Sequence, residues 1–315
     1  MNKKCLYCYK LLNIDEQDYH ADCSRKFFGT PVPPVLSLDR FELQRMAQEL
    51  VLRSIAVTGV QPKLSLDLEK IDARTSRFTV VGLWGNYILK PPTEQFAALP
   101  ENEDLTMKMA AECGIHTAEH TLIRLASGEL AYLTKRFDRQ EGRKVHMEDL
   151  CQLTETLTEH KYRGSMEKVG RVVRAYTTNK GLETLKLFEI TVFCFLTGNT
   201  DMHLKNFSLL RPENDDIALS PAYDLLSTKL VIPEDREESA LTINGKKNRL
   251  LRTDFDKLAL NLGISEKSAG RVYTRFAQKK AFMHALIERS FLPIHLQKAY
   301  IDLLDSGLDR LKIKG

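Results

Sequence analysis

Residues 182–197 are apolar on almost every side of a helix, which constrains the fold more than any other feature of the chain. The large apolar side chains are Leu185, Leu187, Phe188, Ile190, Val192, Phe193, Phe195 and Leu196. A helix of this kind lies inside a domain. It is interrupted by Lys186 and Glu189 and is shorter than the roughly 18 apolar residues that a membrane span needs. We therefore predict a buried helix.

A polar loop, Gly-Asn-Thr-Asp-Met-His-Leu-Lys-Asn, follows this helix directly from Gly198. It places Asp201 and Asn206 five positions apart, and Asp224 follows 18 positions later. Phosphoryl-transfer centres use this spacing: the first Asp accepts the proton of an attacking hydroxyl, while the Asn and the second Asp offer oxygen ligands to magnesium. An ordinary Asp-rich surface loop is the alternative.

The residues after Asn206 predict how Asp224 returns to this loop. Two short apolar runs, 207–210 and 217–219, flank a turn-rich stretch, which is typical of a β-hairpin. The hairpin would bring Asp224 back beside Asn206.

Lys90 is a candidate nucleotide-binding residue. The β-type runs 78–81 and 87–89 predict a hairpin with Lys90 at the end of its second strand, where two prolines stop the strand. Glu103 lies in a Pro-Glu-Asn-Glu-Asp segment that opens a predicted helix, and kinases hold their lysine with such a glutamate. A solvated lysine at a strand end is the alternative.

The segment Thr58-Gly-Val-Gln-Pro-Lys63 precedes these strands. Its backbone amides and Lys63 can cover phosphates, or it can form a tight turn between two β segments. It contains one glycine and is not a Gly-x-Gly-x-x-Gly loop.

Six motifs occur in the order found in HipA-like serine/threonine kinase toxins, and the chain most resembles the short HipT-type members. The motifs are Ser54–Leu64, Tyr87–Pro91, Glu101–Glu103, Thr134–Arg139, Gly198–Ser208 and Pro221–Ser227. The resemblance extends from about residue 30 to near the C-terminus. It implies an α+β, bilobal protein-kinase-like fold with ATP between a strand-rich N-terminal lobe and a mainly helical C-terminal lobe.

The resemblance also implies roles for single residues. Asp201 would be the catalytic base, and Asn206 and Asp224 would hold Mg²⁺. Lys135 and Phe137 would flank adenine through their backbone. The implied ATP-binding residues are Lys90, Glu103, Lys135, Phe137, Thr58, Gly59, Gln61, Lys63, His203 and Lys205.

Family members of this kind phosphorylate a serine in an aminoacyl-tRNA synthetase and are the toxins of type II toxin–antitoxin systems. They also autophosphorylate in the Gly-rich loop, where Thr58 stands as an acceptor and Ala56 replaces a second one. The resemblance implies two kinds of partner: a helix-turn-helix DNA-binding antitoxin, through which DNA contact would be indirect, and a small separate protein equivalent to the missing N-subdomain.

The N-terminus predicts a second site. Cys5-x2-Cys8 and His20-x2-Cys23 have the pairwise spacing of a tetrahedral Cys3His zinc site. A segment this small buries little core, so a structural Zn²⁺ would supply folding free energy. Three packed thiols are the alternative.

We predict three parts: a zinc-binding segment at 1–30, an N-terminal kinase lobe at 31–138 and a helical C-terminal lobe at 139–315. A stiff Gly29–Pro34 linker follows the first part. A length of 315 residues with 43% hydrophobic content suffices for two cores. Single cysteines at 113, 151 and 194 favour reduced thiols, and no signal peptide is visible, so the predicted location is cytoplasmic without membrane contact.

Two further classes of function stay open. Residues 255–276 are typical of a helix-turn-helix, with Lys267, Arg271 and Arg275 on the second helix, which would make the protein a DNA-binding transcription regulator. A basic run at Lys246, Lys247, Arg249 and Arg252 is a second candidate surface for nucleic acid or an acidic partner. The other class is an inactive kinase-fold scaffold.

Overall fold

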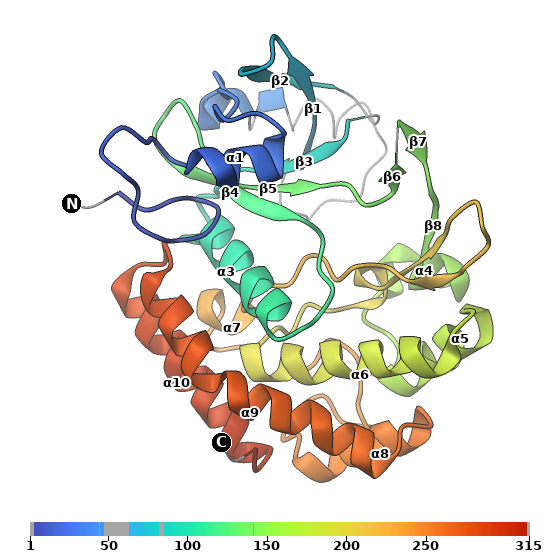
Figure 1. The fold of residues 1–315 in the computed structure, drawn as a ribbon. Coiled ribbons are helices and arrows are strands. Elements are labelled where there is room, and N and C mark those ends of the chain that lie inside the picture. Colours follow the sequence, from blue (N-terminus) through green and yellow to red (C-terminus); the bar gives the residue numbers. More distant parts are fainter. Residues whose placement is uncertain (1–2, 44, 47–62, 82–84, 141, 314–315) are drawn as a thin grey trace. The chain divides into compact units, whose positions relative to one another are not determined.

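The computed structural model describes residues 3–43, 45–46, 63–81, 85–140 and 142–313, and the chain divides into two compact units (Figure 1). Unit 1 comprises Met1–Asp104, Ala118–Arg136 and Arg289–Leu292. Unit 2 comprises Leu105–Thr117, Phe137–Glu288 and Pro293–Gly315. Helix α3 (Leu99–Glu112) begins in unit 1 and ends in unit 2.

Unit 1 is built on a five-stranded antiparallel sheet with the order β2-β1-β3-β5-β4. The strands are β1 (Leu64–Lys70), β2 (Ser76–Val80), β3 (Tyr87–Lys90), β4 (His120–Arg124) and β5 (Leu130–Lys135). Strand β3 ends at Lys90, as the two following prolines predict. In the centre of the sheet Leu89 of β3 pairs with Leu64 of β1 and Leu133 of β5, and all three side chains are fully buried.

The predicted hairpin between the runs 78–81 and 87–89 is wrong. Strand β1 lies between β2 and β3 and pairs with both of them. The sequence did contain evidence for strand β1: Leu64, Leu66 and Leu68 alternate with polar residues, which is the period of a half-buried strand. The true hairpin joins β1 to β2, where the Asp72 carboxylate accepts hydrogen bonds from the amides of Arg74 and Thr75.

The N-terminal segment belongs to unit 1 and packs on its sheet. Helix α1 (Ala21–Phe28) ends at Gly29, which takes a left-handed φ of 79°. The Phe27 ring of α1 lies 6.1 Å from the ring of Tyr87 on β3. In the predicted Gly29–Pro34 linker, Thr30 is buried and its hydroxyl lies 3.2 Å from that of Ser76 on β2.

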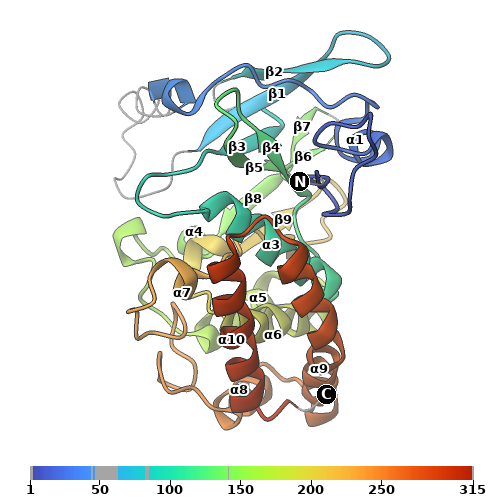
Figure 2. The same cartoon turned by 90° about the vertical axis from the view of Figure 1, so that its left-hand side faces the viewer.

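Unit 2 is mainly helical (Figure 2). Its helices are α4 (Leu150–Leu153), α5 (Met166–Tyr176), α6 (Lys180–Thr197), α7 (Thr228–Val231), α8 (Arg252–Asn261), α9 (Glu266–Arg289) and α10 (Ile294–Arg310), with short 3-10 turns at Thr158–His160 and Leu204–Asn206. The predicted buried helix is confirmed as α6, which contacts α5, α8 and α10. Figures 1 and 2 show α5 and α6 side by side.

A small sheet of unit 2 confirms the predicted hairpin after Asn206. Strand β9 (Ser208–Arg211) pairs with β10 (Ala218–Leu219) on one side and with β8 (His146–Asp149) on the other. A separate ribbon joins β6 (Arg139–Gln140) to β7 (Arg143–Lys144). Among the described residues, no helix is both long enough and apolar enough to cross a membrane.

Several cations of the two candidate nucleic-acid surfaces form ion pairs within unit 2. Helices α8 and α9 do form a helical pair with a turn at Gly263, but Arg275 of α9 pairs with Glu189 of α6 at 2.8 Å. In the basic run, Lys246 pairs with Asp254 and Lys247 with Glu237, at 2.9 and 3.2 Å. Because carboxylates offset these cations, the run offers little net positive charge to a phosphate backbone.

Candidate active site

The loop that carries Asp201 starts where α6 ends at Gly198, whose φ of 65° is left-handed. The Asp201 amide donates to Oδ1 of Asn199 at 3.0 Å. Nδ2 of the buried Asn206 donates to the carbonyl oxygen of Asp201 at 3.0 Å. This last bond closes the five-residue loop, so the two predicted site residues share one turn.

The turn that carries Asp224 is fastened to the same loop by Tyr223. The hydroxyl of Tyr223 donates to the carbonyl oxygen of Lys205 at 2.7 Å and lies 2.7 Å from the hydroxyl of Ser208. Its ring packs against Phe137, with 5.4 Å between centroids. Asp224 itself has a φ of 55°, a left-handed conformation that Asp tolerates better than most residues.

His203 is a buried histidine in the loop between Asp201 and Asn206. Burial lowers the pKa of His203 below its usual value, and the negative charges of Asp201 and Asp224 act in the opposite direction. Among the described residues, Nδ1 of His203 and Nδ2 of Asn199 are buried without a hydrogen-bond partner.

The donor set of this site fits Mg²⁺. Because Nδ2 of Asn206 is used by the Asp201 carbonyl, the amide oxygen of Asn206 is the atom left to act as a ligand. Asp224 adds a carboxylate, and oxygen atoms of these two kinds are the ligands that Mg²⁺ prefers. Asn206 and Asp224 could therefore hold a magnesium ion.

The sequence prediction missed Tyr162, whose hydroxyl donates to Oδ1 of Asp201. Partial burial, together with the hydrogen bond to the Asp201 carboxylate, raises the pKa of Tyr162 well above its usual value. The ring of Tyr162 also packs edge-on against His203, with 5.0 Å between centroids. Tyr162 precedes Asp201 by 39 residues, and no local motif signals that contact.

In unit 1, Lys90 and Glu103 form a buried ion pair. Nζ of Lys90 lies 2.5 Å from Oε1 of Glu103, and the side chains are 3% and 0% exposed. Lys90 also lies over the ring of Tyr132, 5.3 Å from its centroid. Helix α3 supplies Glu103, as the sequence predicts, and the alternative of a solvated lysine is wrong.

A buried polar network surrounds this pair. Asp104, the neighbour of Glu103, accepts a hydrogen bond from the hydroxyl of Tyr9 at 2.6 Å and lies 2.8 Å from Nδ1 of His120. The His120 ring stacks on Tyr132, with centroids 5.7 Å apart. Tyr132 in turn faces Lys90, so the network returns to the ion pair.

Six further predicted ATP-binding residues can be compared with the structure only in part. The backbone amide of Lys135 donates to the carbonyl of Glu119, so that amide is not available to adenine. Nζ of Lys205 lies 2.8 Å from Oδ2 of Asp149, which directs this lysine toward the start of α4. Thr58, Gly59 and Gln61 lie outside the described residues, and Lys63 is exposed just before β1.

The four predicted zinc ligands lie together in unit 1. One side-chain atom from each of Cys5, Cys8, His20 and Cys23 falls within 4.8 Å of the others. All three cysteines are free thiols. The arrangement is compatible with a metal ion.

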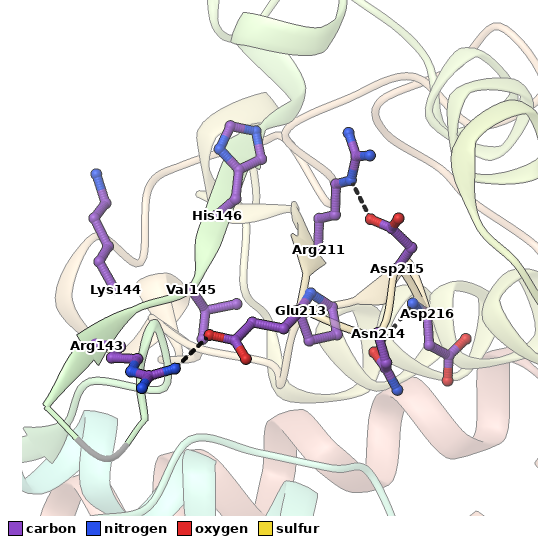
Figure 3. A pocket seen from close by; sticks show the side chains of 10 residues that line it. Arg143, Lys144, Val145, His146, Arg211, Glu213, Asn214, Asp215 and Asp216 are labelled. Carbon is purple, nitrogen blue, oxygen red and sulfur yellow. Dashed lines mark hydrogen bonds and ion pairs between the residues drawn. The ribbon is translucent and has the colours of Figure 1, made fainter.

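A groove of about 1050 Å³ lies between β7 and the turn after β9 (Figure 3). It is lined by Arg143–His146 and Arg211–Asp216. Arg143 pairs with Glu213 and Arg211 with Asp215, at 2.9 and 2.7 Å. Opposite charges are thus paired along the groove, and none of the predicted site residues lines it.

A sheet unit with a buried lysine–glutamate pair and a helical unit with an Asp, Asn and Asp constellation define a kinase-like fold. Solved structures agree with it. The Shewanella oneidensis MR-1 toxin HipA, in complex with HipB and operator DNA, has a TM-score of 0.65 at 20% identity, covering 82% of this chain and 65% of that one. The Helicobacter pylori proinflammatory kinase CtkA has a TM-score of 0.54 at 17% identity, covering 72% and 88%.

The chain belongs to the family of the HipA-like C-terminal domain, whose model matches residues 55–282. A Haemophilus influenzae relative named "Putative kinase" is 28% identical and covers 76% of this chain. "Putative kinase Y4dM" of Sinorhizobium fredii is 36% identical over 67% of this chain, and the serine/threonine-protein kinase toxin HipA of Shewanella oneidensis is 28% identical over 58%. The matches span 77%, 54% and 45% of those relatives.

Proposed function

We propose that this chain is an ATP-dependent protein kinase that phosphorylates serine or threonine. The observation that supports this best is the hydrogen bond from Asn206 to the Asp201 carbonyl, because it holds a candidate base and a candidate metal ligand in one rigid turn. Family membership and relatives that carry kinase names add support.

In the proposed reaction, the carboxylate of Asp201 accepts the proton of a serine or threonine hydroxyl of the substrate protein. The hydroxyl oxygen forms a bond to the γ-phosphorus of ATP, and the bond between that phosphorus and the β,γ-bridging oxygen breaks, which releases ADP. The Tyr162 hydroxyl donates a hydrogen bond to Oδ1 of Asp201. In the proposed complex the substrate hydroxyl would replace Tyr162 as the donor to this oxygen.

The remaining residues would bind the nucleotide. Lys90, held by Glu103, contributes a cation for the phosphates, and Asn206 and Asp224 hold Mg²⁺, which offsets phosphate charge when bound. Phe137, the Lys135 carbonyl, His203, Lys205 and the segment with Thr58, Gly59, Gln61 and Lys63 complete the proposed ATP site, and Thr58 is the proposed autophosphorylation site.

We further propose that the kinase is a short, HipT-type toxin of a type II toxin–antitoxin system that acts in the cytoplasm. Its substrate would be an aminoacyl-tRNA synthetase, whose phosphorylation inhibits translation. The solved complex of Shewanella oneidensis HipA with HipB and operator DNA supports a helix-turn-helix antitoxin as partner. A small N-subdomain-like protein would be a second partner, and co-purification with the neighbouring gene products tests both.

Incubation of a cytosolic extract with labelled ATP and Mg²⁺ tests the activity. The wild type should label one or a few proteins, and Asp201→Asn should lose roughly 10²- to 10⁴-fold in rate, as expected for loss of a general base. Asp216→Asn is the matched control, because Asp216 is an exposed aspartate of the same unit. Equal labelling by the wild type and Asp201→Asn would contradict the proposal.

Mass spectrometry of the same extract identifies the substrate. A phosphoserine in an aminoacyl-tRNA synthetase that depends on Asp201 would support the toxin assignment. Phosphorylation of other proteins alone would retain the kinase activity and overturn the proposed target.

A further inference from the structure

The cysteine and histidine cluster of the N-terminal segment brings four potential ligand atoms close to the spacing of a tetrahedral ion. Nδ1 of His20 lies 3.4 Å from Sγ of Cys8 and 3.7 Å from Sγ of Cys23. With Zn–S and Zn–N bonds of about 2.3 and 2.1 Å, tetrahedral ligand atoms are roughly 3.5 to 3.8 Å apart. The longer His20 separation lies in this range and the shorter lies just below it, while all four ligand atoms lie within 4.8 Å of one another.

The orientation of His20 also fits a metal ligand. Its Nε2 lies 2.9 Å from the carbonyl oxygen of Leu11, which can only accept, so Nε2 carries the hydrogen. Nδ1 is then the unprotonated nitrogen, and it faces the sulfurs of Cys8 and Cys23. Zinc-binding histidines commonly use their second nitrogen in this way.

The turn between Cys5 and Cys8 sets the position of the next residue, Tyr9. The Tyr9 amide donates to the Cys5 carbonyl at 2.9 Å, and its φ is 63°, a left-handed value that a side chain as large as tyrosine rarely adopts. Its side chain is only 1% exposed, and its hydroxyl donates to Asp104 at 2.6 Å. A metal on the two cysteines would stabilise this strained turn.

We infer that Cys5, Cys8, His20 and Cys23 bind one Zn²⁺, and that this site positions the Lys90–Glu103 pair through Tyr9 and Asp104. Asp104 lies inside helix α3, directly after Glu103. One of its carboxylate oxygens accepts from Tyr9, and the other contacts Nδ1 of His120. Loss of the metal would release Tyr9 and loosen the part of α3 that carries Glu103. The consequence for ATP binding rests on the proposed function, but the zinc site and the coupling do not.

Metal analysis tests the first half of this inference. Freshly purified wild type should contain close to one equivalent of zinc, and Co²⁺ exchanged into the protein should show thiolate charge-transfer absorption. Cys8→Ser should retain less than about a fifth of an equivalent, whereas Cys151→Ser, which changes a cysteine on α4, should match the wild type. Wild type with less than about a tenth of an equivalent and no cobalt band overturns the site.

Hydrogen–deuterium exchange of a peptide covering 99–112 tests the coupling without any nucleotide. Tyr9→Phe removes one hydroxyl and should keep its zinc, yet exchange in this helix should become about 5- to 10-fold faster, as should exchange in zinc-stripped wild type. Tyr19→Phe is the matched control, because this equally buried tyrosine of the same segment donates to the Leu122 carbonyl and not to Asp104. Equal exchange in the two variants overturns the coupling, whether or not the protein is a kinase.

Discussion

The ammonium group of Lys90 lies 2.5 Å from the carboxylate of Glu103, and both side chains are almost completely buried. Transfer of two charges from water to a protein interior costs several kcal/mol for each, and a well-packed apolar pair often stabilises a fold as well or better. Stability alone therefore does not explain this pair. The proposed role of Lys90 in binding nucleotide phosphates would explain it.

Glu103→Gln should lower the free energy of unfolding by about 3 to 5 kcal/mol, because it removes the carboxylate that offsets the buried Lys90 charge. Urea denaturation followed by circular dichroism measures this change. The exposed Glu112→Gln on the same helix is the control and should change stability by less than about 0.5 kcal/mol.

The double variant Lys90→Met/Glu103→Leu separates stability from function. We expect it to regain most of the stability lost in Glu103→Gln, since neither charge is then buried, and still to fail to bind ATP. Isothermal titration with Mg²⁺–ATP measures the binding. A double variant that binds ATP as well as the wild type would exclude Lys90 from the nucleotide site.

Asp224→Asn should reduce phosphoryl transfer by roughly 10² or more, because it removes the carboxylate proposed to hold Mg²⁺. Asn tolerates the left-handed backbone of this position, so the fold should be retained. Rates measured across a Mg²⁺ titration should show a higher Mg²⁺ requirement. Asp215→Asn is a close control, since Asp215 is also at positive φ, 57°, but is exposed in the turn after β9.

Local signals were sufficient to predict the helix and the turn that carry Asp201 and Asn206. The apolar composition of residues 182–197 was enough to predict helix α6. Two apolar runs around a turn were enough to predict the hairpin of β9 and β10. The hydrogen bond between Asn206 and Asp201 spans five residues, a distance over which sequence spacing constrains geometry well.

Non-local contacts were not predictable in the same way. The alternation of apolar and polar residues in β1 is visible in the sequence. The position of this strand between β2 and β3, however, depends on pairing energies across the whole sheet. Tyr162 reaches Asp201 from 39 residues away, and Tyr9 reaches Asp104 from 95. Neither tyrosine lies in a motif, so only the folded chain reveals these partners.

Gly198→Ala should lower the free energy of unfolding by about 1 to 2 kcal/mol, because Gly198 has a left-handed φ of 65° at the end of α6. An added Cβ would also lie 2.7 Å from Cδ2 of Leu303. Gly181→Ala, in the first turn of the same helix, meets no atom within 4 Å among the described residues and should be neutral or slightly stabilising. Thermal unfolding of both variants gives the comparison, and equal melting temperatures would contradict the strain at Gly198.

The free energy of unfolding should fall as the pH rises from about 4.5 to 7, because Glu101 loses its proton in this range. Burial, with smaller contributions from Asp104 and Glu129, raises the pKa of Glu101 from 4.5 to about 7. The folded state therefore binds this proton more tightly than the unfolded state does. The stabilisation is complete below about pH 4.5, declines through that window and is lost above about pH 7, with a total of at most about 3 kcal/mol.

Glu101→Gln removes this titration, so its stability relative to the wild type should increase steadily from pH 4.5 to 8. Because Gln stays neutral, the variant should be the more stable protein above pH 7, where the wild type must bury a charged carboxylate. Urea denaturation of both proteins at intervals of half a pH unit measures the difference, in which titrations shared by the two proteins cancel. A difference that stays constant across this range would show that Glu101 titrates near its ordinary value.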